Sequence, residues 1–169
     1  MNTHAYQEVS RTSTVGLTKI GLVAALYVAV TLILAVISFG AIQLRLSEMF
    51  NYLAIFHKRY IIAVTLGVVI VNFMSPMWFL DVPVGGIATF LVLILSRAIT
   101  KNMKNLRMKI AATAIIFSLS MFTVAGQLYI VFNLPFWVTY LTVGLGELLS
   151  MTIGGIIIYL VNKKIDLAK

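Results

Sequence analysis

Six stretches without a charged side chain constrain the fold of this chain more than any other feature. They are residues 20–44, 49–57, 60–80, 82–96, 110–146 and 148–162. An α-helix rises 1.5 Å per residue, so about 20 apolar residues cross the roughly 30 Å of hydrocarbon in a bilayer. Several of the stretches reach that length, and the sequence therefore predicts a protein that crosses a membrane more than once.

Composition excludes the other classes of protein. Hydrophobic residues make up 61% and charged residues 11% of the 169 residues, and the mean hydropathy is +1.03. A soluble domain of this length has too little interior for that apolar surface, and a disordered chain needs low hydrophobicity and high charge. Cysteine is absent, and His4 and His57 are the only histidines. We therefore expect no disulfide and no bound metal.

The longest uncharged stretch, residues 110–146, is too long for one membrane crossing. Gly126-Gln127 and Asn133-Leu134-Pro135 interrupt it, and we interpret them as a helix end, a loop and a restart. The sequence then predicts an all-α fold, a compact bundle of six transmembrane helices within a membrane domain at residues 17–165. The helices are expected near residues 17–39, 42–57, 60–76, 84–98, 109–127 and 136–162.

The positions of the basic residues indicate that the short second segment also crosses the membrane. With six crossings and both termini in the cytoplasm, every Lys and Arg except Arg45 lies on the inner side. If the segment did not cross, the basic residues of the 97–109 loop would face outward, against the positive-inside rule. Residues 1–16 and 166–169 are then cytoplasmic. The net charge of +8 follows from topology, and we expect no nucleic-acid partner.

Motifs of catalysis are missing from the chain. No GxxxxGK[ST] loop is present, so ATP hydrolysis by the usual P-loop route is not expected. His57 lies at a predicted cytoplasmic turn, far from the acids, which disfavours a Ser-His-Asp arrangement. We therefore expect neither enzymatic activity nor a cofactor.

Glu147 is the charged residue with the least favourable predicted position. It lies about 17 Å from the outer end of the last predicted helix, near the middle of the bilayer. A carboxylate that faces lipid there costs at least about 2.5 kcal/mol, so it must face the bundle interior, a partner or a ligand. Two interpretations stay open. Glu147 is either a buried acid satisfied by Arg45 or by a hydroxyl such as Thr139, or a functional acid.

Further polar and aromatic side chains lie at that depth or above it and are candidates for lining an outward pocket. The candidates are Gln43, Arg45, Glu48, Asn72, Trp78, Asp81, Gln127, Asn133, Trp137 and Tyr140. Singly, each Trp fits the interfacial aromatic belt, and Arg45 and Glu48, three residues apart, fit a local ion pair. Together, carboxylates, a guanidinium and aromatic rings indicate a site for a flat, polar, amine-bearing ligand.

The first predicted helix carries a face of small residues. Gly21, Ala25 and Ala29 recur every four residues, and such faces allow helices to approach closely in lipid. Packing within the bundle and docking of a partner explain this pattern equally well.

Three segments of the chain, in order, resemble the queuosine-precursor transporter (QueT) family. They are FGAIQLRLSE at 39–48, Ser75-Pro76 followed by Leu80-Asp81-Val82 and Gly85, and VGLGE at 143–147. The resemblance covers about residues 17–165. It departs from the family pattern at residues 55–59, where a proline is expected near the end of the second helix.

The resemblance implies a substrate-binding S component of an energy-coupling-factor (ECF) transporter in a prokaryotic cell membrane. Its substrate would be a queuosine precursor, a 7-deazaguanine-type base or queuine. Its partners would be one transmembrane T subunit, docked by an Ala-x-x-x-Ala motif that Ala25 and Ala29 match, and two ATPases. The implied substrate site takes in Gln43, Arg45, Glu48, Asn72, Asp81, Gln127, Trp137, Tyr140 and Glu147. One carboxylate can accept the two adjacent N–H groups of a guanine-like edge, but which acid does so stays open.

Two other functions stay open at this stage. A stand-alone ion-coupled transporter could use Glu147 as its coupling site, and its uptake would collapse with the ion gradient. A structural or pore-forming membrane subunit would show no saturable ligand, and it leaves the clustered outer acids unexplained.

Overall fold

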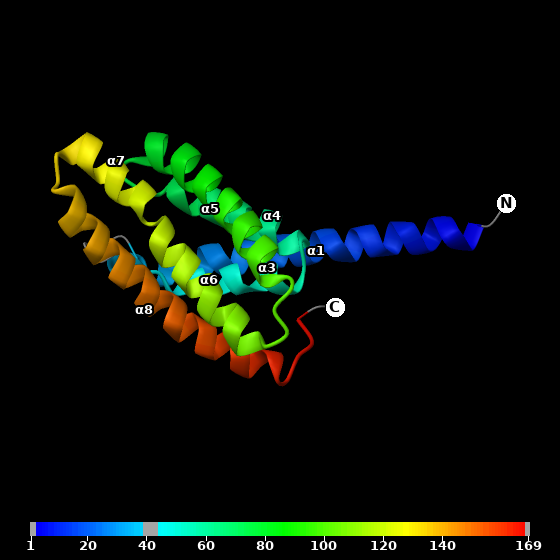
Figure 1. Cartoon of the computed structure of the whole chain (residues 1–169). Helices are drawn as coiled ribbons and strands as arrows, with labels where there is room; N and C mark the ends of the chain where they lie inside the picture. The colour runs from blue at the N-terminus through cyan, green and yellow to red at the C-terminus, as the bar shows by residue number, and fades with distance from the viewer. Residues whose placement is uncertain (1–2, 39–43, 168–169) are drawn as a thin grey trace.

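The computed structural model is helical, with no strand in the parts of the chain that it describes (Figure 1). Those parts are residues 3–38 and 44–167, with side chains for 14–35, 38 and 44–167. The helices are α1 (Thr3–Ile33), α2 (Ala35–Ser38), the 3₁₀ helix η1 (Leu46–Tyr52), α3 (Leu53–Phe56), α4 (Arg59–Asn72), α5 (Trp78–Thr100), α6 (Leu106–Ser120), α7 (Phe122–Phe132) and α8 (Phe136–Asn162). They form six segments. Three segments consist of two consecutive helices each, namely α1 with α2, η1 with α3, and α6 with α7, and the other three are α4, α5 and α8. The predicted all-α, polytopic fold class is confirmed.

Four of these segments are long and apolar enough to span a membrane. They are residues 14–33 of α1, α5, the α6–α7 pair and α8, while α4 is a shorter apolar helix. Large apolar side chains also cover their outer faces; Ile87 on α5 and Leu145 on α8 are each more than 60% exposed. Such a surface is stable against lipid tails and not against water.

The second segment differs most from the helix predicted over residues 42–57. It is regular only over residues 46–56, and it begins as a 3₁₀ helix. A 3₁₀ helix rises about 2.0 Å per residue, so this segment extends further than an α-helix of equal length. Most of its side chains are buried, the polar Glu48 and Asn51 included, and the segment contacts α1, α4, α5 and α8. It forms the centre of the bundle.

Several other predicted helix boundaries were wrong. The helix expected from residue 84 begins at Trp78 and runs through Pro83, which puts Asp81 in its first turn and not in a loop. No helix ends at Gly126-Gln127 as expected. The helix breaks earlier, at Met121, and then continues through Gly126-Gln127 to Phe132. Asn133 ends α7 instead, with φ 54° and ψ 29°, a left-handed conformation that Asn tolerates. α1 begins at Thr3, inside the polar N-terminal segment, and ends at Ile33. α8 has the predicted bounds.

The turn between α3 and α4, where a proline was expected, is closed by His57. The backbone N–H and the Nε of Arg59 donate to His57 Nδ1 at 3.1 and 2.9 Å. Burial, together with the positive charges of Arg59 and Arg97, lowers the pKa of His57. A neutral imidazole has a free acceptor nitrogen, so the turn is closed without proline.

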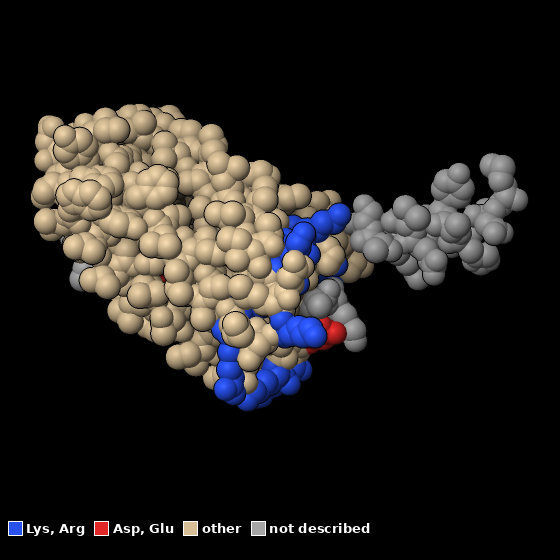
Figure 2. Space-filling model, viewed as in Figure 1, with Lys and Arg blue, Asp and Glu red and all other residues tan. Residues whose placement is uncertain are grey.

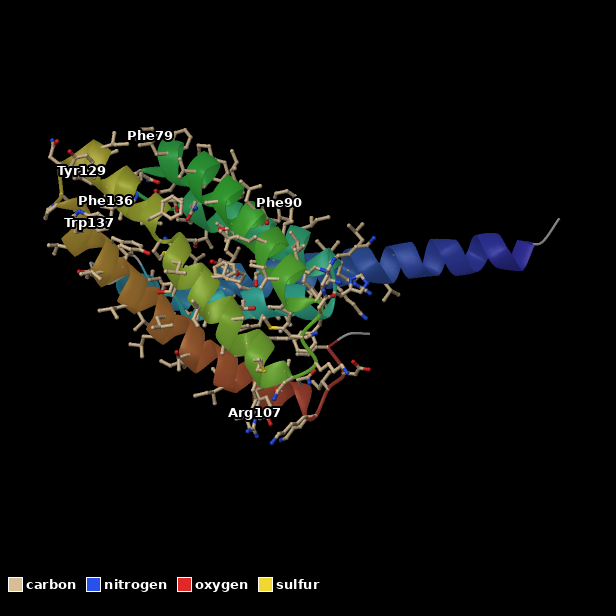
Figure 3. All side chains as sticks on the ribbon, in the orientation of Figure 1. Phe79, Phe90, Arg107, Tyr129, Phe136 and Trp137 are labelled. Atoms are coloured by element: carbon tan, nitrogen blue, oxygen red, sulfur yellow. The ribbon has the colours of Figure 1, made fainter. Side chains whose placement is uncertain are left out.

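Basic side chains and several exposed aromatic side chains lie at opposite ends of the bundle. Figure 2 shows the Lys and Arg side chains collected at one end of the visible face. In Figure 3, Arg107 lies at that end, and Phe79, Tyr129 and Trp137 lie at the other. An end rich in Lys and Arg fits the cytoplasmic side of a membrane, and aromatic residues fit its interfaces.

We predict that single cysteines at Asn102 and Asn133 are labelled from opposite sides of the membrane. Both positions are exposed, Asn102 after α5 and Asn133 before α8, and the chain has no other cysteine. A membrane-impermeant thiol reagent added to intact cells should modify the Asn133→Cys variant only. Labelling of both variants from outside would contradict the six-crossing arrangement.

Candidate ligand site in the centre of the bundle

A cavity of about 270 Å³ lies among η1, α4, α5, α6, α7 and α8. Its polar wall consists of Arg45, Glu48, Asn72, Ser75, Asp81, Thr89, Ser120, Thr123, Gln127 and Glu147. The rest of the wall is aliphatic or aromatic and includes Val68, Val92 and Phe117. Pockets for drug-sized ligands measure roughly 300–1,000 Å³, so this cavity fits a smaller molecule of one or two rings.

The structure brings together six of the residues predicted to bind substrate. Arg45, Glu48, Asn72, Asp81, Gln127 and Glu147, from five different elements, all line the cavity. Trp137 and Tyr140 lie outside it: Trp137 is 72% exposed, and the Tyr140 hydroxyl donates to the carbonyl of Leu119 at 3.2 Å. Gln43 lies outside the described residues.

Glu48 is held in the cavity wall by two neighbouring side chains. The hydroxyl of Tyr27 on α1 donates to Glu48 Oε1 at 2.6 Å, and Asn51 Nδ2 donates to Oε2. Tyr27 and Asn51 are completely buried, and hydrogen bonds to an ionised group are about twice as strong as neutral ones. Sequence reasoning missed Tyr27, because a buried tyrosine in an apolar helix looks like an ordinary core residue.

Asp81 links three elements in the wall of the cavity. Ser75 Oγ, in the turn after α4, donates to Asp81 Oδ2, and Gln127 Nε2 on α7 donates to Oδ1. The side chain of Asn72, at the end of α4, donates from Nδ2 to the backbone carbonyl of Asp81 at 2.7 Å. Both carboxylate oxygens of Asp81 are thus occupied by bonds within the protein.

Two buried acceptors in the cavity wall have no such bonds. Among the described residues, Glu147 Oε1 and Asn72 Oδ1 have no hydrogen-bond partner, although Glu147 is only 4% and Asn72 only 2% exposed. A buried polar atom without a partner costs about 1–3 kcal/mol, and more when it is charged. Glu147 also experiences the negative charge of Glu48 and the positive charge of Arg45. A ligand that carries N–H donors would satisfy both open acceptors.

Several lining residues were not predicted from the sequence. Ser75, Thr89 and Thr123 add hydroxyl groups, and Phe117 adds the aromatic surface that was expected from Trp137. Ser75 stands in one of the segments that carry the family resemblance, so a signal for it was available. Thr89, Phe117 and Thr123 have no local signal, because only the packing of α5 against α6 and α7 brings them to the cavity.

A polytopic helical bundle with a small, acceptor-rich cavity in its centre is a membrane protein built to hold a small solute. Comparison with known proteins agrees: residues 17–163 match the family model described as QueT transporter. The chain is also similar to the Queuosine precursor transporter QueT of Lactococcus lactis subsp. cremoris (strain MG1363), with 41% identity over 95% of this chain and 100% of that protein. No solved structure matches. The chain therefore belongs to the QueT transporter family, and the predicted family is confirmed.

We predict that Tyr27→Phe lowers the free energy of unfolding more than Tyr52→Phe does. Both hydroxyls are buried, but Tyr27 donates to a carboxylate and Tyr52 to the carbonyl of Met151 at 2.8 Å. Hydrogen bonds to charged groups contribute about 1.5–3 kcal/mol, against about 0.5–1.5 kcal/mol for neutral ones. Denaturant unfolding of the two purified variants in the same detergent measures the difference. Equal losses would show that Glu48 does not depend on Tyr27.

Proposed function

We propose that this chain is the substrate-binding S component of an ECF transporter that takes up a queuosine precursor. The name of the Lactococcus relative supports the substrate class. The observation that carries the proposal concerns Glu147, which lines the cavity and whose buried Oε1 has no partner among the described residues. A membrane protein keeps a carboxylate at such a position when a bound solute provides donors for it.

A 7-deazaguanine-type base matches the open positions of the cavity. Its guanine-like edge carries two adjacent N–H donors, which a single carboxylate such as Glu147 can accept in bidentate fashion. The keto oxygen of the base needs a donor. Arg45 and Gln127 both line the cavity and both carry N–H groups, although each already donates one of them, Arg45 to the carbonyl of Ser38 at 3.3 Å and Gln127 to Asp81. A bicyclic base also suits a cavity of about 270 Å³.

The exposed face of α1 supports docking to a T subunit. Val23, Tyr27 and Thr31 on this helix are buried in the bundle, whereas Gly21, Ala25 and Ala29 are exposed. The small residues are therefore available to a helix of another subunit, which can approach closely where no bulky side chain intervenes. Transport energy would come from the ATPase partners, because the chain contains no P-loop motif.

We predict that Glu147→Gln weakens binding of 7-aminomethyl-7-deazaguanine by about 10- to 150-fold. The exchange keeps the shape but replaces an acceptor by a donor, and a hydrogen bond to a charged group contributes about 1.5–3 kcal/mol. The ligand-free variant should be as stable as the wild type or slightly more stable, because a buried charge is removed. Titration and thermal unfolding of the purified chain measure both quantities.

Ser150→Ala is the control for this experiment. Ser150 lies almost one turn further along α8, is completely buried, donates to the carbonyl of Gly146 and does not line the cavity. It should leave the affinity unchanged. A Glu147→Gln variant that is destabilised but binds normally would refute a ligand role for Glu147 and leave it a structural acid.

We predict that Ala29→Trp abolishes uptake and assembly with the T subunit but spares ligand binding. An indole on the exposed small-residue face separates the two helices, and it does not reach the cavity. Ile87→Trp is the control, since Ile87 is 62% exposed on α5, away from this face. Co-purification with the T and ATPase subunits measures assembly. Uptake that persists without them and collapses with the ion gradient would favour the stand-alone transporter instead.

A further inference from the structure

The side-chain amide of Asn72 is fixed in one orientation. Its Nδ2 donates to the backbone carbonyl of Asp81 at 2.7 Å, and only the nitrogen of an amide can donate to a carbonyl. Gly85, one turn further along α5, packs directly against that nitrogen, and a Cβ at this position would overlap it. The absence of a side chain at Gly85 therefore leaves room for the amide where it lies.

This orientation leaves the amide oxygen of Asn72, a residue that lines the cavity, as an acceptor without a bond in the described part of the chain. Oδ1 is buried, it has no partner among the residues that the structure describes, and Asn72 lines the cavity together with Gly85. A donor on a bound ligand would satisfy this fixed, neutral acceptor. It stands on a different element from Glu147, at the end of α4 and not in the middle of α8, so the two acceptors contact different parts of a ligand.

We infer that Asn72 Oδ1 accepts the pyrrole N–H of the bound base, so that the site selects free bases over nucleosides. The inference rests on the proposed function. Glu147 accounts for the ring N–H and one amino N–H of the guanine-like edge. The second amino N–H lies beside that same edge, so for an acceptor on a different element the pyrrole N–H is the remaining neutral donor. An ammonium group on the substituent prefers a carboxylate, because charged pairs are stronger than a bond to a neutral amide. A nucleoside carries its sugar in place of this N–H and therefore has no donor for Asn72 Oδ1.

The test compares two ligands that differ at this single donor. One is 7-deazaguanine, and the other is its furan analogue, in which a ring oxygen replaces the pyrrole N–H without adding bulk. The wild-type chain should bind the furan analogue about 5- to 150-fold more weakly, because Asn72 Oδ1 then stays unsatisfied. Isothermal titration of the purified chain in detergent gives both affinities.

Matched variants assign the discrimination to Asn72. Gly85→Ala displaces the amide without removing a polar group, and Gly126→Ala makes the same exchange in α7 where a Cβ meets nothing within 4 Å. Gly85→Ala should bind 7-deazaguanine more weakly and discriminate between the ligands by less than about 2-fold, while Gly126→Ala should match the wild type. Asn72→Leu, which removes the acceptor outright, should lose the discrimination in the same way. Asn72→Leu therefore provides the same test if Gly85→Ala proves unstable in thermal unfolding without ligand.

The possible failures are distinguishable. Tight binding of both ligands by the wild type, together with weak binding by Glu147→Gln, would overturn the inference and leave the proposed function standing. If Gly85→Ala and Gly126→Ala reduced the discrimination between the two ligands equally, the inference would also be overturned. The reduction would then come from the higher helix propensity of Ala and not from displacement of Asn72. A wild-type chain that binds no deazaguanine at all would overturn the proposed function and the inference with it.

Discussion

Hydrogen bonds between α1 and η1 hold a polar segment in the middle of a bundle whose outer surface faces lipid. Tyr27 donates to Glu48 at 2.6 Å, and the hydroxyl groups of Thr31 and Ser47 are hydrogen-bonded to each other at the same distance. Without water in the hydrocarbon layer, these groups must find partners within the protein. Because α1 supplies them, η1 can occupy the centre of the bundle. There its buried side chains contact α1, α4 and α8, and Glu48 reaches the cavity.

The same helix has a second role because its two faces differ. One face of α1 is committed to the interior by Tyr27 and its neighbours, so the opposite face, with Gly21 and Ala29, has no packing role inside the bundle. A helix that fixes the position of Glu48 is thus the helix proposed to meet the T subunit. The exposed face of α1 and the geometry of the site are connected through the buried hydroxyl groups of Tyr27 and Thr31.

Sequence periodicity and charge predicted the class of fold, the last helix and most of the charged groups around the cavity. Those features follow from costs that act locally, such as the cost of placing Glu147 in lipid. The boundaries failed where tertiary contacts outweigh local signals. Pro83 and Gly126 are ordinary breakers of helices, yet both lie inside helices here, and the break falls at Met121, which carries no such signal. The amide orientation of Asn72 was equally invisible, since it depends on a contact with Gly85 across two helices.

By sequence alone, the acids of the cavity form one set. Their hydrogen-bond partners in the structure divide them into two kinds. Glu48 and Asp81 each have both oxygens bonded to side chains of the protein, so these carboxylates join helices to one another. Glu147 has an oxygen without a partner among the described residues, and so does the amide of Asn72. A bond that is already made in the empty protein stabilises the fold but adds little to binding. An acceptor left open at a cost in the empty protein lowers the free energy only when a donor arrives. We therefore expect Glu48 and Asp81 to stabilise the fold, and Glu147 and Asn72 to determine which solute is bound.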